Sequence, residues 1–427
     1  MSTAKKLVVP GTLNRTNYGT TRWLALLATL GPGVTVMLAD TDAGSIITAA
    51  QSGAQWGYRL VILQLLLIPI LYFMQELTTR IGITTGRGHG ELIKEQFGPK
   101  WAWFSVLTLF VSAVGALVTE FSGIAGAGLL FGVPPWVSVP AAALLLILIT
   151  RWGRYSRVER IAIFIGLFEL VFLPAVFLAH PDPTALVHAL YGSQPLHDRS
   201  YWLLIAANVG AVIMPWMVFY QQGAVVDKGL TPAALKFSRV DTAVGSVATQ
   251  VIMIAVLVLA AATIGRTHPD APLADVQQIA LALAPVVGTL GGKVLFAVGV
   301  TGAALIAAIV VSLAVSWAFG EVLGFRCSLN CTWREAPAFY SLYAGGIIIA
   351  GTLVLLGIPL VSLTIAVEIM NALLLPIVTG FLLALGWKAL PHPYRLRVWE
   401  KAVLIFIYLV ICSLGIFTLF QLHLFSR

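Results

Sequence analysis

The fold of this chain is decided by the stretch 31–45, Gly31-Pro32-Gly33-Val34-Thr35-Val36-Met37-Leu38-Ala39-Asp40-Thr41-Asp42-Ala43-Gly44-Ser45. It lies inside an apolar segment long enough to cross a bilayer, yet its middle carries two carboxylates. A carboxylate at membrane depth is costly, and such residues mark ion or substrate paths. A helix broken beside that carboxylate leaves backbone carbonyls free to coordinate a cation. We therefore predict that Asp42 and its neighbours form half of a cation site.

The composition is that of a membrane protein. Of the 427 residues, 59% are hydrophobic and only 10% are charged, and the mean hydropathy is +0.92. A soluble domain would carry about 25% charged residues. The apolar runs are continuous rather than alternating, which indicates an all-α polytopic protein and not a β-barrel. The net charge of +8 is typical of basic cytoplasmic loops and does not require nucleic acid as a partner.

Apolar runs of about 20 residues predict eleven transmembrane helices. They lie near 23–50, 58–79, 102–131, 137–150, 160–180, 201–222, 242–265, 291–320, 337–357, 361–386 and 401–424. We expect residues 1–22, which are polar and basic, to be a cytoplasmic segment rather than a secretory signal. The expected organisation is then a first five-helix repeat at 23–180, a second at 201–386, and a peripheral eleventh helix at 401–427.

Lysine and arginine fix the expected orientation. All but five of the 26 lie in segments that face the cytoplasm if the N-terminus is inside, the exceptions being Arg59, Arg199, Arg266, Lys293 and Arg427. Positively charged loops stay on the cytoplasmic side. We expect a multi-pass protein of the inner (plasma) membrane with the N-terminus cytoplasmic and the C-terminus outside. The outer loops 181–200 and 266–278 instead carry four aspartates, which suits a protein that takes in cations.

The sixth predicted span contains a second break. It reads Asn208-Val209-Gly210-Ala211-Val212-Ile213-Met214-Pro215-Trp216. Proline in a helix interior removes a backbone hydrogen bond and clashes with the preceding turn. Spans one and six are each the first of a possible five-helix set, and breaks at matching positions in two halves point to a transporter site at the repeat interface. No repeat is visible residue by residue, so this symmetry rests on span order.

The two breaks offer different donor atoms to a cation. Asp42 offers a carboxylate and Ser45 a hydroxyl, and unwinding at Gly44 would free the carbonyl of Asp42 or Ala43. Opposite them, Met214 offers a thioether, a soft ligand that prefers transition metals to Mg²⁺ or Ca²⁺. An unwound Ala211 would add its carbonyl. The structural alternatives are that Met214 only fills space and that Asp42 pairs with a base, although the adjacent spans contain no basic residue except Arg59 at the start of 58–79.

Four other acids lie within or at the mouth of predicted spans: Glu120, Glu169, Asp241 and Glu368. Such acids carry protons in transporters, but they can equally be hydrogen-bonded structural groups. Asp40 is two residues from Asp42, so on an intact helix the two side chains point to different sides. We expect Asp40 either to support the metal ligands from behind or to face a water path.

Several residues that carry chemistry in other proteins show no recognisable motif here. The glycine-rich loop around His89 follows no strand and predicts a solvated turn or a gate, not a phosphate site. Cys327 and Cys331 lack a second ligand pair, so we expect neither zinc nor a disulfide. The Ser, His and Asp residues show no nucleophile-elbow spacing, and we expect no enzyme and no cofactor.

At these residues the chain resembles the NRAMP metal-ion transporters, which have the LeuT-type 5+5 inverted-repeat fold with broken helices 1 and 6. The resemblance is carried by Gly31-Pro32-Gly33, Asp42-Ala43-Gly44-Ser45, the segment from Met74-Gln75-Glu76-Leu77 to Gly86, Glu120-Phe121-Ser122-Gly123, Leu130-Phe131-Gly132-Val133-Pro134, and Ala211 to Pro215. It implies that Asp42, Ser45, the Ala211 carbonyl and Met214 bind the metal. It also implies import of divalent transition metals such as Mn²⁺ or Fe²⁺, generally coupled to protons.

The chain departs from the family pattern at four positions. The signature proline is Ala43, the signature asparagine is Ser45, and the histidine after Met-Pro is Trp216. Glu368 stands where the family often has a metal-facing glutamine, and we count it as a fifth metal ligand. Because the histidine implicated in proton handling is absent, we place the candidate proton path at Glu120 and Asp40. Divergent branches that resemble Mg²⁺ transporters lack the methionine, whereas Met214 is retained.

The sequence therefore predicts a secondary transporter that imports divalent transition-metal ions by alternating access. Its partners would be the metal ion as substrate, protons and the lipid bilayer, and we expect a monomer. One alternative is a Mg²⁺ or broad-range divalent importer without tight proton coupling. An alternative of another class is a sodium-coupled amino-acid transporter of the same fold, although Asp42 would repel a substrate carboxylate.

Overall fold

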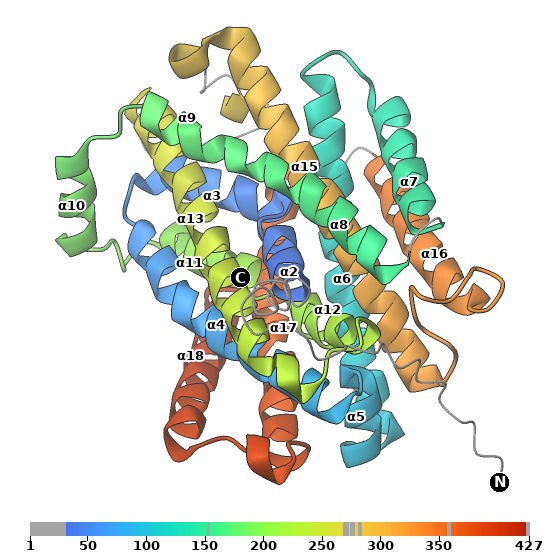
Figure 1. Cartoon of the computed structure of the whole chain (residues 1–427). Helices are drawn as coiled ribbons and strands as arrows, with labels where there is room; N and C mark the ends of the chain where they lie inside the picture. The colour runs from blue at the N-terminus through green and yellow to red at the C-terminus, as the bar shows by residue number, and fades with distance from the viewer. Residues whose placement is uncertain are drawn as a thin grey trace, which may run out of the picture.

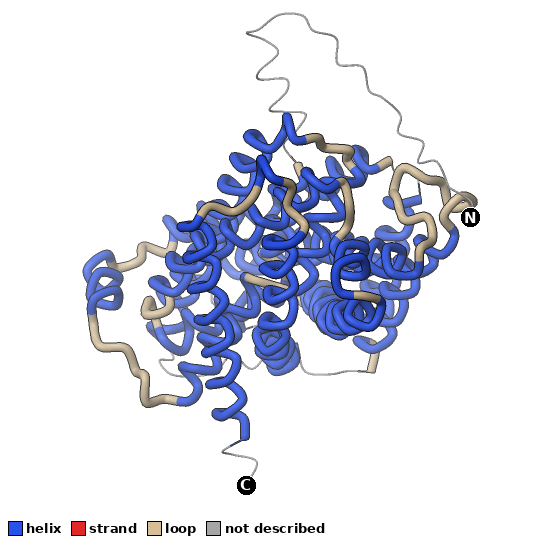
Figure 2. The backbone as a smooth tube through the Cα atoms, turned by 90° about the horizontal axis from the view of Figure 1, so that it is seen from below, coloured by secondary structure: helices blue, strands red, loops and turns tan. Residues whose placement is uncertain are grey.

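The computed structural model describes residues 31–151, 154–267, 273, 278–280, 284–356 and 360–423. Within these ranges every regular element is a helix (Figure 1, Figure 2). In chain order they are α2 (Pro32–Asp40), α3 (Ala43–Trp56), α4 (Val61–Thr85), α5 (His89–Phe97), α6 (Pro99–Leu129), α7 (Pro135–Arg151), α8 (Tyr155–Gly166), η1 (Leu167–Val171), α9 (Phe172–Leu178), α10 (Pro183–Tyr191), α11 (Arg199–Val212), α12 (Pro215–Asp227), η2 (Pro232–Ala234), α13 (Leu235–Thr267), α15 (Ala284–Leu323), α16 (Pro337–Val354), α17 (Leu360–Lys388), η3 (His392–Tyr394) and α18 (Val398–His423).

The predicted membrane spans are present. In the described ranges nine helical stretches are long and apolar enough to cross a membrane, one of them being α11 and α12 taken together. The two-part helix α2–α3 and the 17-residue α7 account for the remaining two of the eleven predicted spans. The expectation of an all-α, multi-pass membrane protein is confirmed. Residues 1–30, and with them the cytoplasmic segment and the start of the first span, lie outside the described residues.

Some predicted boundaries were wrong, and the second span is the clearest case. The sequence predicted an end at residue 79, but α4 continues to Thr85. The helix can carry charge in this last part because Arg80 pairs with Glu76 one turn earlier at 2.7 Å. Gly86 then adopts a left-handed conformation (φ 63°), which only glycine takes readily, and closes the helix.

The two broken helices occupy the centre of the bundle. In Figure 1 the segment α2 lies among α13, α15 and α12, and it contacts all three. The segment α11 packs against α17 and α3. Nearly every residue of α3 and α12 is buried, whereas outer helices carry exposed apolar side chains such as Phe164 on α8 and Phe406 on α18. Apolar side chains on the outside of such a bundle face lipid, so both breaks lie in the protein interior.

The prediction of a solvated turn was wrong for His89, although Gly86 in the same loop is exposed. His89 is the first residue of α5 and is fully buried. Its Nδ1 lies 3.0 Å from Gln222 Oε1, and its ring packs edge-on against Phe219, both on α12. Burial lowers the pKa of His89 to about 4, and the hydrogen bond between His89 and the Gln222 side-chain oxygen opposes this shift. The neutral His89 side chain therefore anchors the start of α5 to α12.

Two carboxylates of the predicted outer face are helix N-caps. Asp182 accepts a hydrogen bond from the Thr184 backbone at 2.9 Å, and Asp198 accepts one from the Ser200 backbone at 2.7 Å, so they cap α10 and α11. Hydrogen bonds to these side chains lower the pKa of both carboxyls. The other two aspartates of the predicted acidic face lie outside the described residues.

Candidate functional site

The first helix break lies at Thr41 and Asp42. Asp42 has extended backbone (φ −63°, ψ 175°), and its Oδ1 accepts a 2.6 Å hydrogen bond from the backbone N–H of Ser45. Aspartate is a strong N-cap because its side chain satisfies an N–H group that the first helical turn leaves unpaired. Asp42 Oδ2 is buried and has no hydrogen-bond partner within the described part of the chain. Half of this carboxylate is therefore available to a ligand.

The position of this break corrects one expectation. We expected unwinding at Gly44 to free the carbonyl of Asp42 or Ala43. In the structure Gly44 is already helical, and the Asp42 carbonyl accepts a 3.0 Å hydrogen bond from the N–H of Ile46. Because the Asp42 cap starts α3 before Gly44, this residue offers its side chain rather than its carbonyl.

The second break lies at Ile213 and Met214, between α11 and α12. Pro215 begins α12 and has no N–H, so the carbonyl of Ala211, four residues earlier, has no helical donor. The Ser45 hydroxyl donates to that carbonyl instead, at 3.0 Å. This hydrogen bond joins the two breaks across 166 residues of sequence. Ser45 and Ala211, both candidate metal ligands, are therefore direct neighbours.

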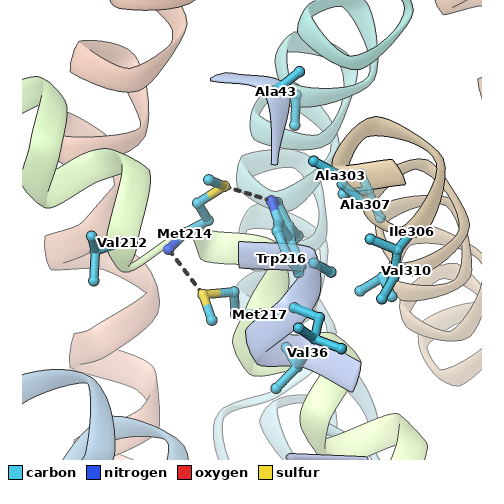
Figure 3. Packing of buried hydrophobic residues seen from close by; sticks show 14 of the residues in the cluster. Val36, Ala43, Val212, Met214, Trp216, Met217, Ala303, Ile306, Ala307 and Val310 are labelled. Carbon is cyan, nitrogen blue, oxygen red and sulfur yellow. Dashed lines mark hydrogen bonds between the residues drawn. The ribbon is translucent and has the colours of Figure 1, made fainter. Parts of the chain in front are cut away.

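The sulfur of Met214 is already in contact with a donor. The indole N–H of Trp216 points at Met214 Sδ with a distance of 2.9 Å between the nitrogen and the sulfur (Figure 3). The Met214 backbone N–H in turn faces Met217 Sδ at 3.5 Å. All three side chains are buried. The indole N–H therefore competes with a metal for the lone pairs of the Met214 thioether, a link that sequence spacing did not reveal.

Glu368 comes to the first break from α17. Its Oε2 accepts a 3.0 Å hydrogen bond from Asn371, whose own oxygen is held by Ser112 at 2.7 Å. Glu368 Oε1 is buried and unpaired within the described residues. A Cβ placed on Gly44 would lie 2.5 Å from Glu368 Oε1 and 3.3 Å from Asp42 Oδ1. Gly44 therefore allows the two carboxylates to face the same small space.

Glu120, the leading candidate for a proton path, also lies at the first break. Its Oε2 accepts a 3.1 Å hydrogen bond from the backbone N–H of Ala43, and its Oε1 is 3.3 Å from the Thr119 hydroxyl. The Glu120 and Asp42 side chains are close enough to interact directly. Glu120 thus satisfies another unpaired N–H at the start of α3 and belongs to the same cluster as Asp42.

Asp40 and Glu169 complete this cluster. Asp40 is the last residue of α2, is fully buried and has two oxygens without hydrogen-bond partners among the described residues. Glu169 lies in the short helix η1 and accepts a hydrogen bond from the hydroxyl of Thr41 at the break itself. Sequence analysis noted Glu169 as a buried acid but gave no sign of its contact with Thr41, because η1 interrupts the predicted fifth span.

The cluster gathers five buried carboxyl groups without basic partners in the described part of the chain. Its five carboxyls are at most 1% exposed, and in the described part of the chain none of them makes an ion pair with lysine or arginine. Buried carboxylates need compensation, which a cation can supply. No group of three or more His, Cys, Asp or Glu side chains in the described ranges is arranged to hold a metal. A metal would therefore also need hydroxyl, carbonyl or sulfur donors.

Asp241 has a role that the sequence did not indicate. Its carboxylate accepts hydrogen bonds from the backbone N–H groups of Gly33 at 2.7 Å and of Gly31 and Val34 at 3.3 Å. A carboxylate at a helix N-terminus is stabilised by the unpaired N–H groups and the helix dipole. Asp241 therefore fastens α2 to α13. The signal that could have found it is the Gly-Pro-Gly start of α2, which leaves N–H groups that need an acceptor.

The cysteine pair adds no site. Cys327 and Cys331 are free and partly buried, and burial raises the pKa of both thiols. In the described residues neither thiol belongs to a group of three or more His, Cys, Asp or Glu side chains that could hold a metal.

The chain was compared with known protein families, with curated proteins and with solved structures. A family model described as natural resistance-associated macrophage protein-like (Nramp) matches residues 33–421. The divalent metal cation transporter MntH of Verminephrobacter eiseniae is 28% identical over 350 residues, which cover 77% of each chain. The crystal structure of the Eremococcus coleocola manganese transporter has a TM-score of 0.78 at 18% identity, covering 95% of this chain and 89% of that one.

The likeness extends to a more distant solved structure at the level of the fold. The structure of MhsT in complex with L-phenylalanine has a TM-score of 0.61 at 14% identity, covering 96% of this chain and all of that one. These structural matches share the LeuT-type fold that the resemblance implied. The family match covers most of the sequence, including both helix breaks. The chain belongs to the Nramp family.

Proposed function

We propose that this protein imports divalent transition-metal ions, such as Mn²⁺ or Fe²⁺, by alternating access. The relatives named above are a divalent metal cation transporter and a manganese transporter. The observation that carries the proposal is the hydrogen bond from Ser45 to the Ala211 carbonyl. It holds the two broken helices together next to unpaired oxygens of Asp42 and Glu368.

The proposed metal ligands are Asp42, Ser45, the Ala211 carbonyl, Met214 and Glu368. Asp42 Oδ2 and Glu368 Oε1 supply negative charge, and Ser45 and Ala211 supply neutral oxygens. When the metal arrives, the Ser45 hydroxyl would turn away from the Ala211 carbonyl so that both oxygens face the ion. Met214 would supply the soft ligand that favours a transition metal over Mg²⁺. The C-terminal ends of α2 and α11 also direct their negative dipole ends towards the breaks.

Alternating access is supported by the way the cluster is enclosed. Asp42, Ser45, Met214 and Glu368 are at most 1% exposed, so neither side of the membrane reaches them in this conformation. Release towards one side requires part of a broken helix to move, and Asp241 accepts hydrogen bonds from the backbone N–H groups of Gly31, Gly33 and Val34 on the N-terminal turn of α2. We propose that loss of this contact frees α2. Residues 23–180 and 201–386 would act as the two repeats, with 401–427 peripheral.

Proton coupling is proposed through Glu120 and Asp40. Glu120 adjoins Asp42, and Asp40 lies near Asp42, Glu169 and Glu368. A divalent ion brought to Asp42 adds two positive charges to this cluster, and a proton held there would be repelled and displaced. The distribution of lysine and arginine supports an inner-membrane protein with its N-terminus inside and C-terminus outside. We propose a monomer as the transporting unit.

The alternatives differ in the substrate. A broad-range or Mg²⁺ importer would bind the ion with Asp42 and Glu368, and the Met214 sulfur would keep its hydrogen bond from Trp216. A sodium-coupled amino-acid transporter shares the fold, but a substrate carboxylate would meet the buried acids around Asp42 without a compensating base. The family membership and the charge of the cluster favour the metal ion.

The test is Mn²⁺ binding to the detergent-purified protein by titration calorimetry. Asp42→Asn keeps a side chain that caps helices well but removes the charge, and we expect it to weaken Mn²⁺ binding about 100-fold or more. Asp182→Asn is the matched control, because Asp182 also caps a helix but lies on the surface, and it should bind like the parent. Equal binding by the parent and Asp42→Asn would overturn the proposed site.

A further inference from the structure

A second site lies away from the helix breaks, at the basic end of the molecule. A cavity of about 480 Å³ opens between α4, the start of α13, the segment 393–397 and the first turn of α18. These helices are neighbours, since α4 contacts both α13 and α18. In Figure 1 the labels α4 and α18 lie one above the other towards the lower left of the bundle. Four arginines and two glutamates line the cavity: Arg80, Arg239, Arg395, Arg397, Glu76 and Glu400.

The acids of the cavity are already matched by two of its arginines. Arg80 is buried and pairs with Glu76 at 2.7 Å and with Glu400 at 2.8 Å. Arg239 pairs with the other oxygen of Glu76 at 2.7 Å, although its side chain is 41% exposed. The floor of the cavity is therefore a neutral network that holds α4, α13 and α18 together.

The remaining two arginines give the cavity its positive charge. Arg395 and Arg397 are exposed, and neither guanidinium takes part in an ion pair in the part of the chain that the structure describes. The cavity thus carries two uncompensated charges beside donors of Arg239. Arginine presents a planar fork of N–H groups that matches phosphate oxygens in a bidentate manner.

The rim of the cavity has the character of a membrane interface. Trp399 is 52% exposed and meets Phe73 edge-on, with ring centroids 6.1 Å apart. Tryptophan next to arginine at the end of a span is typical of the head-group region of a bilayer. One residue beyond Arg239 begins a stripe of exposed valines on α13, Val240, Val244, Val247 and Val251. Their spacing of three and four residues places them on one helix face.

We propose that this cavity binds the phosphate head group of an anionic membrane lipid. Arg395 and Arg397 bind the phosphate, Arg239 adds a third donor, and an acyl chain follows the valine stripe. Basic pockets between helices on the cytoplasmic side of a membrane recognise anionic lipid head groups. A free phosphate ion offers the same oxygens, but it has no apolar part that could contact the valine stripe. For this reason we favour the lipid. The proposal does not depend on the metal site.

The experiment is native mass spectrometry of the full-length protein released from detergent with equimolar phosphatidylglycerol and phosphatidylcholine. The parent should retain phosphatidylglycerol in preference. In the double variant Arg395→Gln/Arg397→Gln this preference should fall on the order of ten-fold. Both side chains are exposed and outside the ion-pair network, so the variant should fold. The control Lys100→Gln/Arg334→Gln removes two exposed charges that do not line the cavity and should keep the preference.

The same measurement contains the outcomes that would overturn the proposal. A parent without lipid preference, or a double variant that keeps it, would show that the two arginines bind no lipid. Equal loss in the control would show that the preference reflects total charge. Inorganic phosphate is added in a further arm. If the parent binds inorganic phosphate but shows no preference for phosphatidylglycerol, the pocket is a site for free phosphate and the lipid assignment is wrong.

Discussion

The first helix break is crowded with carboxylates, whereas the second, from Ala211 to Met217, contains no charged side chain. Both interrupt a buried helix and must satisfy the same unpaired backbone groups. At the first break this is done by acids, since Asp42 and Glu120 accept the N–H groups at the start of α3. At the second break Pro215 has no N–H group to donate, and the Ala211 carbonyl accepts a hydrogen bond from the Ser45 hydroxyl instead.

This difference suggests a division of labour. Hard, charged oxygens at the first break would provide most of the attraction for a divalent cation. The second break adds a neutral oxygen and a soft sulfur, which would provide the choice between metals. Variants at the first break should therefore affect the affinity for all divalent ions, and variants at the second break should affect selectivity more than affinity.

The largest effect on the first break, after removal of the Asp42 charge, is expected from Gly44→Ala. The new Cβ would collide with Glu368 Oε1 and crowd Asp42, so the two carboxylates could no longer share one space. We expect Mn²⁺ uptake into proteoliposomes to fall at least about ten-fold. In Gly345→Ala the new Cβ meets nothing within 4 Å, and uptake should be unchanged. If Gly44→Ala transports like this control, Glu368 and Asp42 do not act together.

The second break is tested by Pro215→Ala. Alanine restores an N–H group that can bond to the Ala211 carbonyl and continue the helix through Met214. We expect Mn²⁺ uptake to fall about ten-fold without loss of thermal stability. Pro337→Ala, at the corresponding first position of α16, is the control. Normal uptake in Pro215→Ala would mean that the free carbonyl takes no part in binding.

The smallest effect is expected from Trp216→Phe. This change removes the N–H that contacts Met214 Sδ and leaves the sulfur free. A hydrogen bond contributes about 1 kcal/mol, so we expect Mn²⁺ to bind about five-fold tighter by calorimetry. Trp317→Phe removes a similar buried indole whose N–H has no partner in the described structure, and it should not tighten binding. Unchanged or weaker binding in Trp216→Phe would indicate that the indole does not compete with the metal.

The sequence predicted the eleven spans and the two breaks because apolar length, Asp42 and Pro215 are local signals. It also predicted that Ser45 and Ala211 would lie together, which relied on the family resemblance. It misplaced the first break. The Asp42 carboxylate accepts a hydrogen bond from the Ser45 N–H and starts α3 at Ala43, so Gly44 is helical in spite of its flexibility.

Other contacts depend on tertiary structure and left no local signal. The hydrogen bonds of Asp241 to the start of α2 join residues more than 200 apart in sequence. The contact of Thr41 with Glu169 requires the short helix η1 inside a predicted continuous span. The contact of Trp216 with Met214 spans only two residues, but it depends on a break that turns the indole back towards the sulfur.

The most direct test of the central claim is Mn²⁺ uptake into proteoliposomes against increasing Mg²⁺, with the parent and Met214→Leu compared side by side. Leucine conserves the volume of methionine and removes the sulfur. If both breaks build one site, the parent should take up Mn²⁺ in excess Mg²⁺, and Met214→Leu should be inhibited by on the order of ten-fold less Mg²⁺. If Mg²⁺ inhibits both proteins equally, Met214 only fills space, and the second break does not select the metal.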